Sequence, residues 1–184
     1  MTFDALKKIL PLLLLPISTF AFAEETPFDA ASTVWIMVSA ILVLIMFIPG
    51  LALFYGGMVR AKNVLSVFSQ FFAIAGVAGI LWVSFVYSFV ADTTNMSEGV
   101  LNLNSFVGGF DKAFLLGITD QTLIAGVPEF VLCVFGLTFA MITPCIAVGG
   151  FAERMKFGAV VLFGALWLIL VYGPLAPVSY THLR

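Results

Sequence analysis

The stretch VLCVFGLTFAMITPCIAVGGFAERMKFG, residues 131–158, contains no charged side chain before Glu153. An uncharged run of about 20 residues is long enough to cross the hydrocarbon core of a bilayer as a helix. Within this run Phe135 and Phe139 are four residues apart, a spacing that places two side chains on the same helix face. The stretch therefore predicts a membrane-spanning helix that carries a pair of phenyl rings.

The composition extends this prediction to the whole chain. Of 184 residues, 62% are hydrophobic and 10% are charged, and the mean hydropathy is +1.16. Soluble domains have about 25% charged residues. Four uncharged windows are each long enough to span a bilayer, and they predict an all-α membrane protein, a polytopic helix bundle. The predicted helices cover about residues 33–55, 64–89, 127–151 and 157–176.

The N-terminal residues 1–23 have the pattern of a secretory signal peptide. Lys7 and Lys8 precede a short apolar run, and residues 21–23 read AFA, which is an A-x-A cleavage site. The mature chain is therefore expected to start at Glu24. The alternative, an uncleaved first helix, remains open.

The distribution of basic residues predicts an orientation, because Lys and Arg collect in loops on the cytoplasmic side. Arg60 and Lys62 follow the first predicted helix, and Arg154 and Lys156 follow the third. The loop at about residues 92–121 contains a single basic residue, Lys112, among four acidic ones. We therefore expect a multi-pass protein of the inner (plasma) membrane with its mature N-terminus outside.

Several residues predict local features of the helices. The side-chain oxygen of Asn63 is expected to cap the second helix, and Gly56 and Gly57 are expected to end the first one. Pro49 and Pro144 should each free a backbone carbonyl, which a neighbour or water must satisfy inside a bilayer.

Two pairs of small residues predict close contacts between helices. Ala75 and Gly79 form one pair and Gly136 and Ala140 the other, each with the small-xxx-small spacing that lets backbones approach closely. The predicted helices are therefore expected to pack against one another and not against lipid alone.

Residues with catalytic or metal-binding chemistry are scarce. His182 is the only histidine, and Glu129, at the outer end of the third predicted helix, is expected to be a solvated interface residue. We expect no enzyme, no cofactor and no metal site, and the net charge of −2 does not suggest a nucleic-acid partner. A small cation would have to be bound by aromatic faces, hydroxyls, backbone carbonyls or residues outside this chain. Because a ring face attracts a cation, Phe135 and Phe139 are the candidate substrate-pathway residues. A pure packing role for these two rings remains open.

Three motifs resemble the ammonium transporter family (Amt/Mep/Rh). They are IPGLALFYGGMVRAKNVLS at residues 48–66, GGFDKAFLLG at residues 108–117 and VPEFVLCVFGLTFAMITPCIAVGGFAERMKF at residues 127–157. They occur in the family's order, and the resemblance runs from about residue 33 to residue 176.

The resemblance implies a fold and a function. It implies an eleven-helix protein of two inverted five-helix halves plus a last helix, packed as a homotrimer. Residues 24–176 would form the first four of these eleven helices. It implies transport of ammonium or ammonia, with an outer aromatic vestibule, deprotonation near a phenylalanine gate and an apolar pore. Phe139 matches the family's phenylalanine at the recruitment site, and Phe135 lies one turn further out.

The resemblance also implies alternatives and partners. An ammonium sensor, with such a membrane domain coupled to a signalling module, is the alternative function, and a membrane scaffold is a third. A PII-type signalling protein is the expected cytosolic regulator. Residues 177–184 depart from the family pattern and are expected to be a foreign tail, so His182 is not expected to be a pore histidine. Gly136 stands where many relatives have glutamine, which is expected to alter the polarity of the vestibule.

Overall fold

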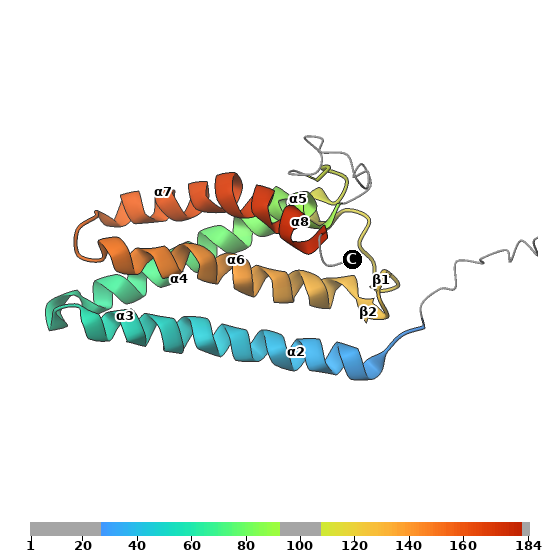
Figure 1. Ribbon diagram of the computed structural model, residues 1–184, viewed down its shortest axis with the longest axis horizontal. Helices are drawn as coiled ribbons and strands as arrows, with labels where there is room; N and C mark the ends of the chain where they lie inside the picture. The colour runs from blue at the N-terminus through green and yellow to red at the C-terminus, as the bar shows by residue number, and fades with distance from the viewer. Residues whose placement is uncertain (1–26, 93–107, 182–184) are drawn as a thin grey trace, which may run out of the picture.

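The computed structural model describes residues 27–92 and 108–181 of the chain. They form a bundle of four long helices (Figure 1), each long and apolar enough to cross a membrane. The four spans are Ala30–Met58, Ala61–Ala91, Glu129–Phe151 and Phe157–Ser179. The predicted class, a polytopic all-α membrane protein, is therefore confirmed, whereas the predicted signal peptide at residues 1–23 lies outside the described residues.

Three of the four spans contain a π-helical turn. The first span consists of α2 (Ala30–Ile45), a π-turn (Met46–Leu51) and α3 (Ala52–Met58). The second consists of a 3₁₀ turn (Ala61–Asn63), α4 (Val64–Leu81), a π-turn (Trp82–Val86) and α5 (Tyr87–Ala91). The third is α6 (Glu129–Phe151), and the fourth consists of α7 (Phe157–Trp167), a π-turn (Leu168–Tyr172) and α8 (Gly173–Thr181).

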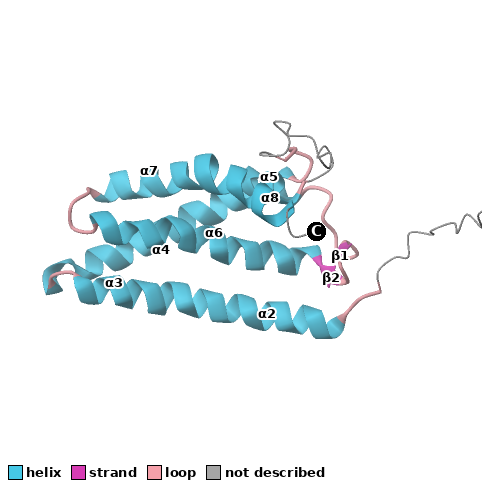
Figure 2. Ribbon diagram, in the orientation of Figure 1, coloured by secondary structure: helices cyan, strands magenta, loops and turns pink. Residues whose placement is uncertain are grey.

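The bundle has two distinct ends. One end, called the hairpin end, carries the described part of the long loop (residues 108–128) with a 3₁₀ turn (Ala113–Leu115) and the strands β1 (Leu123–Ile124) and β2 (Val127–Pro128). These two strands pair antiparallel and are coloured magenta in Figure 2. The other end, called the turn end, carries the short connections between α3 and α4 and between α6 and α7 (Figure 1).

The hydrophobic core forms two clusters along the bundle. The turn-end cluster consists of Phe47, Ala52, Val67, Phe71, Ile74, Ile142, Cys145, Val148 and Val160. The hairpin-end cluster consists of Ala78, Trp82, Val86, Tyr87, Ile118, Cys133, Ala140 and Leu168. α4 contributes to both clusters and packs against α6 and α7. Because Ile118 belongs to the long loop, this loop is part of the packed core at the hairpin end.

The first helix begins before its predicted start at Thr33. Asp29 caps α2: its Oδ1 accepts hydrogen bonds from the backbone N–H groups of Ala31 (2.9 Å) and Ser32 (3.2 Å). The hydrogen bond from the Ser32 hydroxyl, together with these backbone donors, lowers the pKa of Asp29 below its ordinary value. An N-terminal aspartate cap also interacts favourably with the helix dipole, so the helix starts at Ala30.

Two predicted features at the turn end are wrong. Asn63 makes no side-chain cap on α4, and its Nδ2 instead donates to Glu153 Oε1 at 2.7 Å. Gly56 and Gly57 do not end the first helix, because α3 continues to Met58. A Cβ atom at Gly56 would lie 3.1 Å from the ring of Phe68 on α4, so this glycine serves close helix packing.

The third helix begins two residues later than predicted. Val127 and Pro128 belong to β2, and α6 starts at Glu129. The backbone N–H of Asp29 donates to the carbonyl of Gly126 at 2.9 Å, which ties the hairpin to the start of α2. Gly126 has a φ of 81°, a left-handed conformation that favours glycine.

The two prolines lie in different helical environments, and the glycines of the two small-residue pairs have different neighbours. α6 continues through Pro144, and the Thr143 hydroxyl donates at 3.3 Å to the carbonyl of Ala140, the group that Pro144 deprives of its N–H partner. Pro49 lies within the first π-turn. Gly136 contacts another span, but its neighbour is the indole ring of Trp82 and not a helix backbone. Among the described residues, no atom outside the backbone of its own helix lies within 4 Å of a Cβ at Gly79.

Candidate functional site

The structure brings the two predicted site residues together on α6. The ring centroids of Phe135 and Phe139 are 5.0 Å apart, with an interplanar angle of 80°. This edge-to-face arrangement is a favoured geometry for aromatic pairs. Both side chains are partly buried, and the Thr138 hydroxyl donates to the Phe135 carbonyl at 2.6 Å. The aromatic pair therefore keeps part of its surface accessible in a span without a charge between Phe130 and Ala152.

Trp82 is a buried residue that packs on α6 at Cys133 and Gly136, which are close to Phe135 in the sequence. Its side chain is 2% exposed, and its Nε1–H donates to the carbonyl of Cys133 at 3.1 Å. A Cβ atom at Gly136 would lie 2.8 Å from the indole Cζ2. The space beside Gly136 is therefore filled by the indole, which gives this glycine a packing role in addition to the expected change in polarity.

Two tyrosines from different spans pack against the indole. The Trp82 centroid lies 5.6 Å from that of Tyr87 and 6.0 Å from that of Tyr172, with an interplanar angle of 60° in both cases. Such pairs contribute about 0.5–1.5 kcal/mol each beyond their buried area. Trp82 therefore joins the second, third and fourth spans near the aromatic pair.

Glu129 differs from its predicted role. The sequence predicts a solvated interface residue, but Glu129 is 0% exposed. Its Oε1 accepts a hydrogen bond from the Tyr87 hydroxyl at 2.8 Å and forms an ion pair with Lys112. The prediction is wrong because the long loop folds over the start of α6 and supplies the cation that a buried carboxylate requires.

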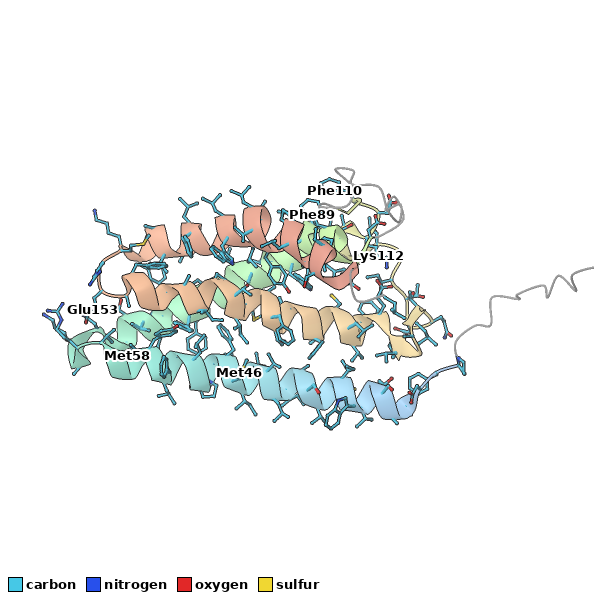
Figure 3. The ribbon with its side chains drawn as sticks, viewed as in Figure 1. Met46, Met58, Phe89, Phe110, Lys112 and Glu153 are labelled. Carbon is cyan, nitrogen blue, oxygen red and sulfur yellow. The ribbon has the colours of Figure 1, made fainter. Side chains whose placement is uncertain are left out.

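The long loop is attached to the end of the second span by further contacts. The Ser88 hydroxyl donates to the Gly109 carbonyl at 2.7 Å and accepts from the Lys112 backbone N–H at 3.1 Å. The rings of Phe89 and Phe110 meet edge to face with centroids 4.9 Å apart. Figure 3 shows these two rings close to Lys112, at the end of the bundle opposite Glu153. Lys112 is therefore held by both its backbone and its side chain.

A second polar cluster lies at the turn end. Glu153 Oε1 accepts from Asn63 Nδ2 at 2.7 Å, from the Arg60 backbone N–H at 2.9 Å and from Arg60 Nε at 3.4 Å. The hydrogen bond from Asn63, followed by those from Arg60, holds the pKa of Glu153 below its ordinary value. The ion pair of Arg60 and Glu153 is solvent-exposed and therefore adds little stability. Its main effect is to join the connection between α3 and α4 to the end of α6.

Sequence reasoning missed several residues of this site. The sequence does contain a signal for the ion pair, because Lys112 is the only basic residue of an acidic loop and Glu129 begins an apolar span. No comparable signal points to Trp82 or Tyr87, which lie in an uncharged window among other aromatic residues. Among the described residues, no group of three His, Cys, Asp or Glu side chains is arranged to hold a metal ion.

Known proteins match both the sequence and the fold. Residues 34–182 match the model of the Ammonium Transporter Family. The chain is 42% identical over 146 residues to an ammonium transporter of Bacillus subtilis (strain 168), and the match covers 78% of this chain and 34% of that protein. It is 36% identical over 160 residues to an ammonium transporter of Aquifex aeolicus (strain VF5), which covers 86% of this chain and 36% of that protein.

A solved structure shares the fold as well. The crystal structure of Candida albicans Mep2 is similar with a TM-score of 0.67 and 32% sequence identity, covering 82% of this chain and 31% of that one. The chain thus spans about a third of the length of the relatives it matches. Because the family model covers most of the chain and the helices are similar to part of Mep2, the chain belongs to the ammonium transporter family.

Proposed function

We propose that this chain forms part of a transporter that moves ammonium or ammonia across a membrane. The cation is recruited at the aromatic pair Phe135 and Phe139, loses a proton near a phenylalanine gate and crosses an apolar pore as ammonia. The observation that carries this proposal is the partly exposed edge-to-face pair on an uncharged span of a chain from this family. No catalytic step on the substrate is required.

The charge distribution along the spans supports proton loss. The interior of each described span is uncharged, and Lys62 and Glu129 lie at span ends. A bare cation in an apolar medium costs many kcal/mol, whereas one ring face contributes about 0.5–2 kcal/mol. The rings can therefore attract the ion but cannot stabilise it along an apolar path. A neutral ammonia molecule avoids most of this cost, because low polarity disfavours the charged form.

The test is uptake of radiolabelled methylammonium by cells that express the full-length protein. Phe139→Ala is expected to lower uptake by roughly tenfold, which corresponds to the loss of about 1.4 kcal/mol of cation binding. Phe139→Leu should fall nearly as far, because it keeps an apolar side chain without a ring face, and Phe139→Tyr should retain most of the uptake. Normal uptake by the Ala and Leu variants at equal membrane levels would exclude the recruitment role.

We propose that the hairpin end faces outward and the turn end faces the cytosol of the inner (plasma) membrane. The exposed basic residues at the turn end support this orientation. They are Arg60, Lys62, Arg154 and Lys156. A cysteine replacing Asp120 should react with a membrane-impermeant maleimide in intact cells, and a cysteine replacing Lys156 should react only after permeabilisation. The reverse labelling pattern would refute the orientation.

We propose that the full-length protein is a homotrimer regulated from the cytosol by a PII-type protein. The wide apolar surface of the first span supports an association within the membrane. Its exposed residues include Val34, Trp35, Val38, Ile41, Leu42 and Ile45. Light scattering of the solubilised protein should give three protomers, and a monomer mass would contradict the trimer.

Purified PII protein should bind inside-out vesicles that contain the full-length protein, and absence of binding would contradict the proposed regulator.

A further inference from the structure

The carboxylate of Glu129 connects three separate segments of the hairpin end. Glu129 is the first residue of α6, Tyr87 belongs to the second span, and Lys112 belongs to the long loop. The Tyr87 hydroxyl and the Lys112 ammonium both bind the same oxygen, Oε1. The Glu129 side chain is fully buried, whereas that of Lys112 is 29% exposed. One buried oxygen atom therefore fixes the relative positions of two spans and a loop.

This arrangement is not explained by stability alone. The other carboxylate oxygen, Oε2, is buried and has no hydrogen-bond partner within the described part of the chain. Burying a charged group with an unsatisfied oxygen costs free energy, and a buried ion pair is on average no more stabilising than well-packed apolar residues. The carboxylate does orient the Tyr87 side chain, because its Oε1 accepts a hydrogen bond from the Tyr87 hydroxyl.

Two links attach the second span to α6 on the N-terminal side of the aromatic pair. The first is Tyr87 to Glu129, and the second is the Trp82 indole to the Cys133 carbonyl, one turn further along α6. The rings of Tyr87 and Trp82 pack edge to face, so the two links are mechanically connected. Phe135 follows Cys133 by two residues. Trp82 therefore connects the Tyr87 side chain to the stretch of α6 at Cys133 and Gly136, which are close to Phe135 in the sequence.

We infer that Glu129 is a positioning residue, paired with Lys112, which holds Tyr87 and Trp82 in place and so sets the geometry of the cation-recruitment site. This inference rests on the proposed transport function. Lys112 keeps the buried carboxylate charge-balanced, and Tyr87 passes its position to the indole. Glu129 itself does not contact the transported cation.

The inference predicts a change in KM that loss of folded protein does not produce. Methylammonium uptake is measured in the full-length protein, with the membrane level of each variant determined separately. Tyr87→Phe removes only the hydroxyl link and is expected to raise KM about tenfold or more, which corresponds to the loss of one hydrogen bond to a charged group, while the maximal rate per transporter is retained. Glu129→Gln leaves Lys112 without a counter-charge and is expected to raise KM at least as much.

A double variant separates positioning from direct attraction of the cation. In Lys112→Met with Glu129→Gln, both charges are absent, and the amide oxygen of the introduced glutamine still accepts from the Tyr87 hydroxyl. The KM of this double variant should return to within about twofold of wild type, because the geometry is kept. If it stays as high as in Glu129→Gln alone, the carboxylate charge attracts the cation and the positioning role is wrong.

Asp111→Asn is the matched control, because it removes one negative charge from the neighbouring exposed residue of the same loop. Its KM should stay within about twofold of wild type, since a screened surface charge contributes little. A wild-type KM for Tyr87→Phe would overturn the positioning role while the proposed function stands if Phe139→Ala is impaired. If Phe139→Ala transports normally, the proposed recruitment role of the aromatic pair fails, and with it the site whose geometry Glu129 is inferred to set.

Discussion

Replacing Gly149 with alanine is expected to destabilise the bundle by about 3 kcal/mol or more and to deplete the folded protein from the membrane. A Cβ atom at this position would lie 2.1 Å from Cε1 of Tyr55 and 2.8 Å from its Cζ. The ring cannot withdraw without losing the hydrogen bond from its hydroxyl to the Ile146 carbonyl at 2.8 Å and its contact with Phe71. The measurement is the melting temperature of the solubilised full-length protein, together with its level in the membrane.

The adjacent residue provides a matched control for this variant. Gly150 lies in the same helix, and within the described part of the chain no atom outside the backbone of that helix lies within 4 Å of a Cβ there. Gly150→Ala is expected to match or exceed the wild-type melting temperature, because alanine is a better helix former by about 1 kcal/mol. If both variants melt at the same temperature, the Tyr55 ring adjusts without cost and close packing at Gly149 is not important.

Trp82→Ala is expected to lower the free energy of unfolding by about 3–5 kcal/mol, the range observed when a buried tryptophan or phenylalanine is truncated to alanine. The indole is 2% exposed and packs between Tyr87 and Tyr172. Its removal leaves a cavity where three spans meet. The measurement is the melting temperature of the solubilised full-length protein, which is expected to fall below the wild-type value.

Trp82→Phe separates the volume of the indole from its hydrogen bond. Phenylalanine refills much of the space but has no N–H group for the Cys133 carbonyl, so a smaller loss of about 1–3 kcal/mol is expected. Uptake per transporter should fall more in the alanine variant, because the aromatic pair lies on the same stretch of α6. An alanine variant that melts like the wild type would show that the indole is not part of the packed core.

The features that the sequence predicts correctly depend on local spacing. The spans follow from uncharged runs whose required length is set by bilayer thickness. The contact between Phe135 and Phe139 follows from helix periodicity, because residues four apart are neighbours on the helix surface. Their role in the substrate pathway stays a prediction, which rests on the family resemblance and on the proposed uptake experiment.

The features that the sequence predicts incorrectly depend on partners far along the chain. Glu129 is buried because Tyr87, 42 residues away, and Lys112, 17 residues away, reach the same oxygen. Asn63 leaves its helix uncapped because Glu153, 90 residues away, accepts a hydrogen bond from its side-chain amide. Neither outcome can be obtained from propensity, since the energy of a polar group depends on whether a partner is present where it is buried.

Four membrane-crossing helices, their uncharged interiors and the two phenyl rings on one face of the third helix all follow from the order of the residues. Bilayer thickness and helix geometry fix these features without reference to any other segment. By contrast, the folded bundle is needed to show that Trp82 fills the space beside Gly136 and that Glu129 is held by Tyr87 and Lys112. These contacts cannot be read from any single segment, because side-chain packing and the pairing of a buried charge exist only once distant segments have come together.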